Sequence, residues 1–542
     1  MPARIHAQSL ALAALLVTAA GAAAADPSAL LPEKNLCADP AGPVALGSAQ
    51  WNGWGRDLDN TRYQPEPALR ATDVPKLTLK WAFGYQGSGG SGQPTIVDGR
   101  VFVTSAMGRV YSLDSRTGCT YWTYDAQAGI RTAISIAELA PQKKAPRPKK
   151  SKRKRTPAHL DVQKAPSAVF FGDDRGAVYA LDAQKGTLLW KTQVEGHPTA
   201  RIQGTPVPYQ DRLYVAVASS EPSAAAADST YPCCTFRGSV AALDVANGNV
   251  LWKTYTVSEE PRPYGNNKMG IQELGPAGVP VLASPTIDTG RSLLYVATGS
   301  SFTGIDQPLA DAVVAFALED GKLRWAKQPP RQEGEAAEFD SSPILRTLAS
   351  GKPVILAGQR SGVVYGLDPE RGGEILWQSQ VAEGKAAGGV EWGPAADHHS
   401  LYVALSGHAG APEDKSGSLT ALDLKTGAKH WQTIAPTPAC TWGDEACSHA
   451  QAQAVTVIPG VAFSGSMDGH LRAYSTIDGK IVWDYETAKD FTTVNGVKAS
   501  GGSLDQGGAT IVNGVLYVNS GNGQQPTGQP GNVLLAFSVD GK

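Results

Sequence analysis

Residues 179–190 read YALDAQKGTLLW, an apolar run that ends in Asp182, a short turn containing Gly186, and a second run that ends in Trp190. Apolar and polar residues alternate on both sides of the turn, which is typical of β-strands rather than helices. Asp and Gly between two such runs are typical of a hairpin turn. The stretch therefore predicts a β-hairpin with a tryptophan in its second strand.

The same pattern recurs along the chain. Further copies end at Trp122, Trp252, Trp325, Trp377, Trp431 and Trp483. Repeats of this kind indicate units that stack on one another, because a single small sheet cannot bury its own apolar face. A row of separate small β domains is the alternative, and the same argument disfavours it.

An eighth copy is divided between the two ends of the chain. NVLLAFSVDGK at 532–542 stops without a tryptophan, and LTLKWAFGY at 77–85 supplies the missing strand with Trp81. Pairing of these two strands closes a ring and removes two exposed sheet edges. We predict an all-β protein in which residues 26–542 form one eight-bladed β-propeller. A ligand is expected at one mouth of its central channel.

The N-terminal end resembles a secretory signal. In residues 1–25, Arg4 and His6 precede an apolar run that ends in small residues at 23–25, so the mature chain is expected to start near Asp26. No later apolar stretch is long enough to cross a bilayer. We therefore expect a periplasmic protein without a membrane span, in which disulfides can form.

The charge pattern gives few indications of a macromolecular partner. The formal net charge of -2 provides no general attraction to nucleic acid or membrane. A basic insert near 141–158, QKKAPRPKKSKRKR at 142–155, combines like charges with prolines and is expected to be a disordered, solvated loop. Contact with an anionic envelope surface or an acidic redox partner is a second interpretation of it.

The six cysteines allow several pairings. Cys440 and Cys447 flank TWGDEA and are expected to pair, and Cys37 could join the N-terminal segment to Cys119. The other two are adjacent, in YPCCTFRG at 231–238. Neighbouring Cα atoms lie about 3.8 Å apart, closer than the roughly 4.4–6.8 Å of an ordinary disulfide. A bond between them would close a tight, strained ring, and the residues alone leave their partners open.

Several stretches resemble the quinoprotein dehydrogenases, a family that binds pyrroloquinoline quinone (PQQ), and most closely its polyvinyl alcohol dehydrogenase branch. They are WNGWGRDLDNTRYQP at 51–65, GIRTAIS at 129–135, YPCCTFRGSVAALD at 231–244, ILAGQRSGVVYGLDP at 355–369, GSMDGHLRAYS at 465–475, NGVKASGGSLD at 495–505 and PGNVLLAFSVDGK at 530–542. The tryptophan repeat also occurs in non-catalytic propellers of outer-membrane assembly. The paired cysteines followed by Arg and Gly are much more specific.

The resemblance implies a set of cofactor contacts. Cys233 and Cys234 would form a disulfide ring stacked on one face of the quinone, and Arg237 would contact a carboxylate of the cofactor. Arg360 matches a position near the quinone oxygens, where positive charge stabilises the developing anion. A solvated surface turn is the alternative for Arg360. Further candidate contacts are Arg131, Thr132, Ser219, Ser220 and Trp392.

The resemblance also implies a cation and a base. Glu221, in VASSEP, occupies the calcium-ligand position, and Ser300 stands where the family carries Asn or Asp. In EFDSSP, Asp340 or Glu338 would accept the hydroxyl proton of an alcohol, and the pattern does not choose between them. Each of these acids could equally be a solvated loop carboxylate.

Some positions depart from the family. Leu282 stands where a tryptophan would stack on the quinone opposite the disulfide, and a leucine offers no π face. Ser300 is a poorer cation ligand than a carboxylate, and Gln203 replaces a small hydroxyl residue. Two hypotheses follow. One is a cofactor-less propeller that serves as a binding scaffold in the cell envelope.

The other hypothesis is a periplasmic alcohol dehydrogenase that uses PQQ and Ca²⁺. The family resemblance implies secondary alcohols, including polymeric ones, as substrates. No Cys-x-x-Cys-His haem motif occurs, so electrons would leave to a separate cytochrome c or quinone. Substrate choice depends on loops that the sequence alone does not position.

Overall fold

A computed structural model describes residues 30–47, 50–90, 92–139, 166–330, 337–382, 389–406, 417–437, 440, 448–522 and 528–542. The expected secretory signal at 1–25, the basic insert near 141–158, and Cys447 lie outside these residues. A search of the described residues finds no helix long and apolar enough to span a bilayer.

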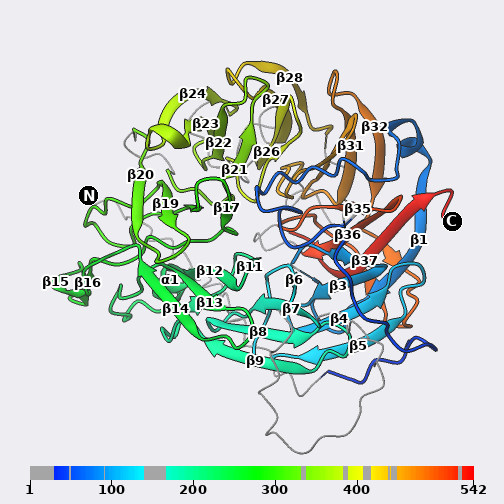
Figure 1. Cartoon of the computed structure of the whole chain (residues 1–542), viewed down its shortest axis with the longest axis horizontal. Helices are drawn as coiled ribbons and strands as arrows, with labels where there is room; N and C mark the ends of the chain where they lie inside the picture. Colours follow the sequence, from blue (N-terminus) through cyan, green and yellow to red (C-terminus); the bar gives the residue numbers. More distant parts are fainter. Residues whose placement is uncertain are drawn as a thin grey trace, which may run out of the picture.

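The described chain forms eight antiparallel sheets, seven with four strands and one with five, arranged as blades around one axis (Figure 1). The first three blades are β2 (Thr95–Val97), β3 (Arg100–Thr104), β4 (Arg109–Asp114) and β5 (Thr120–Asp125); β6 (Ser135–Glu138), β7 (Ser167–Gly172), β8 (Ala177–Asp182) and β9 (Leu188–Gln193); and β11 (Val207–Tyr209), β12 (Arg212–Ser219), β13 (Ser239–Asp244) and β14 (Val250–Tyr255), with β10 (Ala200–Arg201) beside β12.

The next four blades follow in chain order. They are β17 (Thr286–Asp288), β18 (Leu293–Ala297), β19 (Val313–Ala317) and β20 (Leu323–Lys327); β21 (Ile344–Thr347), β22 (Pro353–Gly358), β23 (Val363–Asp368) and β24 (Glu374–Gln380); β25 (Ala395–Ala396), β26 (Ser400–Ser406), β27 (Gly417–Asp423) and β28 (Lys429–Ile434); and β29 (Thr456–Ile458), β30 (Val461–Gly465), β31 (His470–Ser475) and β32 (Ile481–Glu486).

The last blade closes the ring as the sequence predicted. It consists of β35 (Thr510–Val512), β36 (Val515–Asn522), β37 (Pro530–Val539) and β1 (Leu77–Gly84). β1 pairs antiparallel with β37, with Leu77 opposite Val539 and Trp81 opposite Ala536. The first and last strands of the propeller therefore share one sheet (Figure 1).

A few elements lie outside the blades. They are the hairpin of β15 (Arg262–Asn266) and β16 (Gln272–Gly275), the pair β33 (Asp490–Phe491) and β34 (Ala499–Ser500), the helix α1 (Glu221–Ala227), and the 3-10 helices η2 (Ala71–Lys76) and η3 (Pro369–Arg371). The β15–β16 hairpin projects from the rim of the ring (Figure 1).

The repeated tryptophan joins each blade to the next. Trp122 Nε1 donates a hydrogen bond to the carbonyl of Ala183, 3.1 Å away in the following turn, and Trp190 does the same to Val245 at 3.1 Å. Gly186 lies against the Trp122 ring with a φ of 69°, and a Cβ there would approach the indole to 2.5 Å. The same indole-to-carbonyl bond is made by Trp81, Trp252, Trp377, Trp431 and Trp483. The turn glycine and the tryptophan of the motif thus form one interblade contact.

Trp325 is the exception among these tryptophans. Its Nε1 has no hydrogen-bond partner among the described residues. The turn that it faces, in YGLDPERGGEILW, folds into η3 and carries a second glycine, Gly373, which lies under the Trp325 ring. The altered turn does not offer a carbonyl to Trp325 Nε1, but Gly373 still contacts the indole ring.

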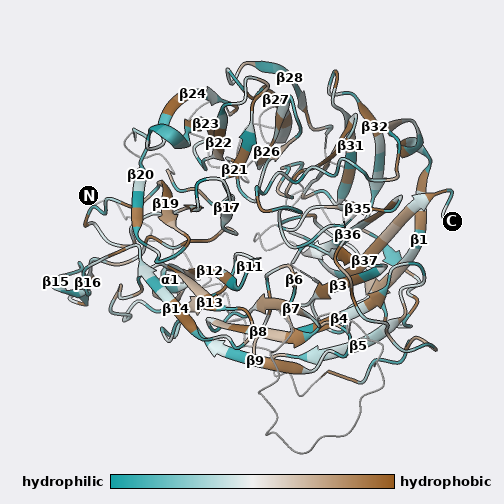
Figure 2. Cartoon of the chain, in the orientation of Figure 1, coloured by the Kyte–Doolittle hydropathy of each residue, from teal (hydrophilic) through white to brown (hydrophobic). Residues whose placement is uncertain are grey.

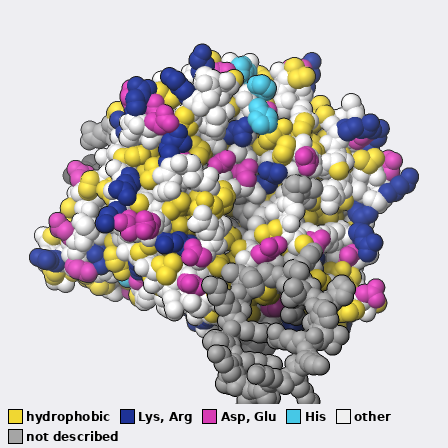
Figure 3. All heavy atoms as spheres, in the orientation of Figure 1, with side chains coloured by type: hydrophobic (Ala, Val, Ile, Leu, Met, Phe, Trp, Pro, Cys, Tyr) yellow, Lys and Arg dark blue, Asp and Glu magenta, His cyan; other side chains and the backbone are white. Residues whose placement is uncertain are grey.

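The apolar core lies between neighbouring blades. Trp122 of one blade packs with Val169, Phe171 and Leu181 of the next, all of them buried. Apolar residues accordingly concentrate on strands such as β3 and β7 (Figure 2). Acidic and basic side chains are interspersed on the face seen in Figure 3, in keeping with the small net charge.

Two predicted disulfides can be followed in the described chain. Cys37 is bonded to Cys119, with Cα atoms 5.1 Å apart, and this bond ties the N-terminal segment to β5. Leu36 forms a parallel bridge with Thr120 beside it. Cys440 is also in a disulfide, and its expected partner Cys447 lies outside the described residues.

Candidate active site

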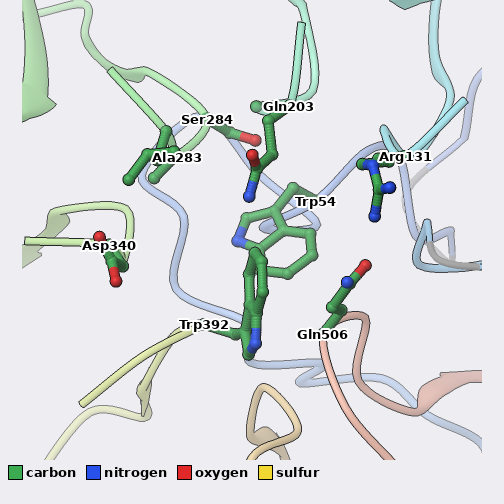
Figure 4. Close-up of a pocket in the computed structure, with 10 residues that line it drawn as sticks. Trp54, Arg131, Gln203, Ala283, Ser284, Asp340, Trp392 and Gln506 are labelled. Atoms are coloured by element: carbon green, nitrogen blue, oxygen red, sulfur yellow. The ribbon is translucent and has the colours of Figure 1, made fainter. Parts of the chain in front are cut away.

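The segment 51–64 runs along the inner ends of several blades. Its backbone bonds to β2 at Ile96, β17 at Ile287, β21 at Leu345, β25 at Ala396 and β29 at Val457. The WNGWGRDLDNTRYQP stretch therefore crosses the central channel, and its side chains are fixed by strands from five blades. Trp54 lies at the middle of this crossing (Figure 4).

A small pocket opens beside Trp54, with a cavity volume of about 20 Å³. The rings of Trp54 and Trp392 lie close together, and Asp340 and Arg131 approach from opposite sides (Figure 4). The remaining lining is polar amide or small and aliphatic, and consists of Gln203, Gly204, Leu282, Ala283, Ser284 and Gln506. The pocket thus combines aromatic walls with one acid and one cation.

Arg360 forms ion pairs with the acids on one side of this pocket. Its Nη1 lies 3.0 Å from Asp340 Oδ2, its Nε 3.7 Å from Glu338 Oε1, and its Nη2 3.6 Å from Glu391 Oε1. One guanidinium is therefore shared by three carboxylates. Ser300 extends the cluster, because its Oγ lies 2.9 Å from Glu338 Oε2 and 2.7 Å from Asp311 Oδ1.

Asp340 has the environment of a base that works near neutral pH. Its side chain is 14% exposed, against 28% for Glu338. Burial raises the pKa of Asp340 to about 7, Arg360 opposes that rise, and the charges of Glu338 and Glu391 add to it. Because Asp340 also lines the pocket, it is better placed than Glu338 to accept a proton from a ligand.

On the opposite side, Arg131 Nε lies 3.1 Å from each carboxylate oxygen of Asp174. Arg201 lies in the same group, and burial lowers its pKa, with Asp174 raising it and Arg131 lowering it. Two guanidiniums around a single carboxylate leave this side of the pocket electropositive. The pocket therefore has an acid–base side and a cationic side.

The adjacent cysteines form the disulfide that the family resemblance implied. Their loop is held from two directions. Cys234 N donates to Leu274 O and Leu274 N donates to Cys233 O, both at 2.9 Å, which joins the loop to β16. Glu221 holds the other side, because its carboxylate accepts hydrogen bonds from Tyr231 Oη (3.1 Å), Thr235 N (2.8 Å), Thr235 Oγ1 (3.2 Å) and Phe236 N (2.9 Å).

The other residues predicted to contact the cofactor are bonded to groups of the protein itself. Arg237 Nη2 lies 2.5 Å from Glu260 Oε1, and its Cζ lies 4.0 Å from the centre of the Tyr255 ring. Thr132 is fully buried and exchanges hydrogen bonds with Gly172. Ser219 Oγ bonds to Thr199 Oγ1 at 2.7 Å and accepts from Glu221 N, and Ser220 stands at the N-cap position of α1 without a capping hydrogen bond from its side chain.

The structure thus gathers the predicted residues in two places. Arg131, Trp392 and Asp340 line the pocket, with Arg360, Glu338 and Ser300 behind Asp340. The second group surrounds Glu221 and consists of Ser219, Ser220, Cys233, Cys234 and Arg237. Backbone bridges from Arg237 to Gly278 and from Gly278 to Ser301 join the two groups.

Sequence reasoning did not assign Trp54, Glu391 or Gln506 to the site. Trp54 was visible in the family-like stretch at 51–65, where two tryptophans lie three residues apart in a segment without strand alternation. Glu391 precedes Trp392, which was predicted. Gln506 carries no local signal, because it reaches the pocket only through closure of the ring.

Comparison with known proteins identifies the family. The family model described as glucose/ethanol/alcohol dehydrogenase, beta-propeller domain, a PQQ domain, matches residues 51–393. The chain is 42% identical to a polyvinylalcohol dehydrogenase from Pseudomonas sp, over 95% of this chain and 81% of that protein. It is 40% identical to a polyvinylalcohol dehydrogenase from Sphingopyxis sp. (strain 113P3), over 93% of this chain and 79% of that protein.

The chain belongs to the PQQ-dependent dehydrogenase family. Solved structures agree on the fold. A quinohemoprotein alcohol dehydrogenase from Pseudomonas putida superposes with a TM-score of 0.64 at 18% identity, covering 93% of this chain and 83% of that one. A second family model, outer membrane protein assembly factor BamB, matches residues 310–534. The comparisons favour the dehydrogenase hypothesis over the cofactor-less scaffold.

The walls of the pocket in this PQQ dehydrogenase carry groups that suit a flat, anionic ring. Trp392 Nε1 is buried without a hydrogen-bond partner in the described chain, although it lies at the pocket wall. A buried donor of this kind is normally satisfied by a ligand, water or protein acceptor. Trp54 offers an aromatic surface, and Arg131 lies where a carboxylate of the cofactor could be bound.

Calcium fits the described residues less well. No group of three or more His, Cys, Asp or Glu side chains within the described ranges is arranged to hold a metal ion. Glu221 already accepts four hydrogen bonds, and Ser300 bonds to two carboxylates. The structure gives no direct contact between Glu221 and Ser300, so the two predicted ligands do not form one site as they stand.

Proposed function

We propose that this PQQ dehydrogenase is a periplasmic enzyme that oxidises secondary alcohols, polymeric ones included, and passes the electrons to a separate cytochrome c or quinone. The observation that carries the proposal is Asp340, a largely buried acid that lines an aromatic pocket and is held by Arg360. The names of the two polyvinylalcohol dehydrogenases to which the chain is similar support a polymer of secondary alcohols as the substrate class.

Asp340 and Arg360 have different roles in the oxidation of the alcohol. When bound, PQQ supplies a quinone that accepts the two electrons released from the alcohol carbon. Asp340 takes the hydroxyl proton, which its pKa of about 7 allows at neutral pH. Arg360 orients Asp340 and keeps positive charge beside it, and this charge favours the developing alkoxide.

The pocket walls position the reactants. Trp54 and Trp392 cover flat surface and exclude water, which strengthens the interactions of Asp340 with the alcohol. On the far side, Arg131 would hold a carboxylate of the cofactor across the pocket from Asp340. The vicinal disulfide Cys233–Cys234 and Arg237 remain candidate contacts of the cofactor.

We propose Ca²⁺ as a second cofactor, with Glu221 and Ser300 as ligands. Ca²⁺ prefers several oxygen ligands, and both residues offer oxygen. Each of them would have to exchange a present hydrogen-bond partner to bind the ion. We therefore derive no catalytic step through the metal.

The periplasmic location is supported by the disulfide between Cys37 and Cys119, because such bonds persist in oxidising compartments. The secretory pattern at 1–25 supports it independently. Cell fractionation of the full chain tests this part of the proposal, and recovery of unprocessed protein in the cytoplasm would contradict it.

The activity is tested with purified protein, PQQ and an artificial dye acceptor. A secondary alcohol, a primary alcohol of equal length and polyvinyl alcohol are compared, with and without Ca²⁺. We expect dye reduction that requires PQQ, that is faster with the secondary alcohol, and that is abolished by Asp340→Asn. Absence of PQQ binding, or equal rates for both alcohols, would contradict the proposed cofactor use or the proposed substrate class respectively.

A further inference from the structure

Arg62 is a cation buried behind the pocket. Only 1% of the residue is exposed. Its guanidinium donates to the carbonyls of Val455 (2.6 Å) and Trp54 (2.8 Å) and to Gln93 Oε1 (2.6 Å). Within the described chain, no carboxylate forms an ion pair with it. Its charge is therefore met by neutral dipoles rather than by a counter-ion.

The guanidinium lies between two indole rings. Its Cζ is 4.8 Å from the centre of the Trp54 ring and 5.9 Å from that of Trp51. Trp54 in turn lines the pocket that we assign to the cofactor. Trp54 thus contacts a buried cation and also lines the pocket, where Figure 4 shows its ring.

The surrounding backbone is shaped around this side chain. A Cβ on Gly508 would approach Arg62 Nη2 to 2.5 Å and Ala454 O to 2.2 Å, so a larger residue does not fit there. Gly393, which directly follows Trp392, has a φ of 153°, and a Cβ there would lie 3.6 Å from Arg62 Cδ and 3.9 Å from Trp54 Cζ2. The Arg62–Trp54 pair is therefore held in one arrangement by segments from three parts of the chain.

A cation in such a place attracts negative charge. Burial lowers the pKa of Arg62 to about 9, and it remains protonated at neutral pH. Interactions with a buried charge are weakly screened, so its field extends across the ring of Trp54 into the pocket. The pocket also lacks an aromatic residue at Leu282, so Trp54 provides a π surface that this position does not.

We propose that Arg62 is a positioning residue for the anionic quinone: it fixes Trp54 as the aromatic wall of the cofactor pocket, and its charge favours the bound ring through that wall. This inference rests on the proposed use of PQQ. The same charge stabilises the reduced, more anionic state of the ring over the oxidised state. It therefore raises the reduction potential of the bound cofactor.

The test measures PQQ affinity by quenching of tryptophan fluorescence, and the midpoint potential of the bound quinone, in Arg62→Met and Arg62→Lys. Arg100→Met is the matched control, because Arg100 is 4% exposed, donates to the Ala183 carbonyl and stacks at 4.9 Å on Tyr121, away from the pocket. We expect Arg62→Met to weaken PQQ binding about tenfold and to lower the potential.

Arg62→Lys is expected to recover most of the affinity, because an ammonium over Trp54 preserves the charge although it loses the planar fork. Should Arg62→Met fail to fold, Trp54→Leu removes the wall while leaving the charge, and we expect it to weaken PQQ binding as well. Unchanged affinity and potential in folded Arg62→Met, or an equal loss in Arg100→Met, would overturn the inference and leave the proposed function standing. Wild-type protein that binds no PQQ would overturn both.

Discussion

Arg360 Nη1 lies 3.0 Å from Asp340 Oδ2, in a pocket where Asp340 is the acid that lines the empty space. The sequence alone did not choose between Asp340 and Glu338 as the proton acceptor, and this contact distinguishes them. Glu338 lies farther from the guanidinium, at 3.7 Å, and is twice as exposed as Asp340. Arg360 therefore positions Asp340 as the base. Glu338 is a nearby carboxylate that contributes charge.

Replacing Asp340 by Asn is expected to lower kcat for alcohol oxidation by about 10²- to 10⁴-fold, because the proton acceptor is lost while the shape is kept. Glu338→Gln removes a similar charge from the same cluster and is expected to have a much smaller effect. Steady-state dye reduction measures both, and PQQ titration confirms that each variant still binds the cofactor. A larger loss in Glu338→Gln would assign the base to Glu338.

The activity is expected to rise with pH and to reach half its maximum near pH 7, because Asp340 must be ionised to accept a proton and burial raises its pKa to about 7. Arg360 holds this pKa down, so Arg360→Gln is expected to move the midpoint to higher pH. The pH profile of kcat/KM in the two proteins measures the shift. A profile that moves to lower pH in Arg360→Gln would contradict the assignment.

The same carboxyl links stability to pH. Its pKa is higher in the folded protein than its ordinary value of 3.8, so the folded state binds this proton more tightly than the unfolded chain. Its contribution to stability is complete below that ordinary value and is lost as the pH rises through about 7. Denaturant unfolding of wild type and Asp340→Asn at both ends of this range measures it. We expect wild type to lose more stability than the variant as the pH rises.

The fold was predictable because its signal is local and repeated. Each hairpin carries its own turn glycine and tryptophan, and Trp122 and Gly186 show why both are needed for one contact. Ring closure was also predictable, because Trp81 lies in the strand that the last copy lacks. The adjacent disulfide followed from the family resemblance rather than from spacing.

The pocket was only partly predictable, because it is built from segments that meet through closure of the ring. Trp54 and Gln506 line the same space although they lie near opposite ends of the chain. The burial that distinguishes Asp340 from Glu338 depends on packing around Arg360, which no local pattern records. Likewise, no family motif predicts that Arg237 forms an ion pair with Glu260.

The Cys37–Cys119 bond is expected to stabilise the protein by about 2–4 kcal/mol, since it closes a loop with a sequence separation of 82 residues. The double variant Cys37→Ser/Cys119→Ser removes it without leaving a free thiol. Denaturant unfolding at constant pH compares the variant with wild type, and PQQ affinity is measured alongside. Because the bond lies at the outer strand β5, we expect the affinity to be unchanged, and an affinity loss would show that the N-terminal segment supports the pocket.

Substitution of Glu221 distinguishes a structural role of this residue from a metal-binding role. Its carboxylate accepts hydrogen bonds from two backbone N–H groups and two hydroxyls of the vicinal-disulfide loop, and it is completely buried. Glu221→Gln places an amide N–H₂ against donors, so we expect a loss of about 1–3 kcal/mol in unfolding free energy. Glu260→Gln is the control, because Glu260 is an exposed acid near the same loop.

The two roles differ in their response to Ca²⁺. If Glu221 binds the ion, Ca²⁺ raises the unfolding temperature of wild type and of Glu260→Gln, because a ligand that binds the folded state alone stabilises it. It then leaves the unfolding temperature of Glu221→Gln unchanged. An equal rise in all three proteins would place the ion elsewhere. The oxygen cluster of Ser300, Asp311 and Glu338 would then be the next place to look, because its side chains already lie within 2.9 Å of Ser300 Oγ.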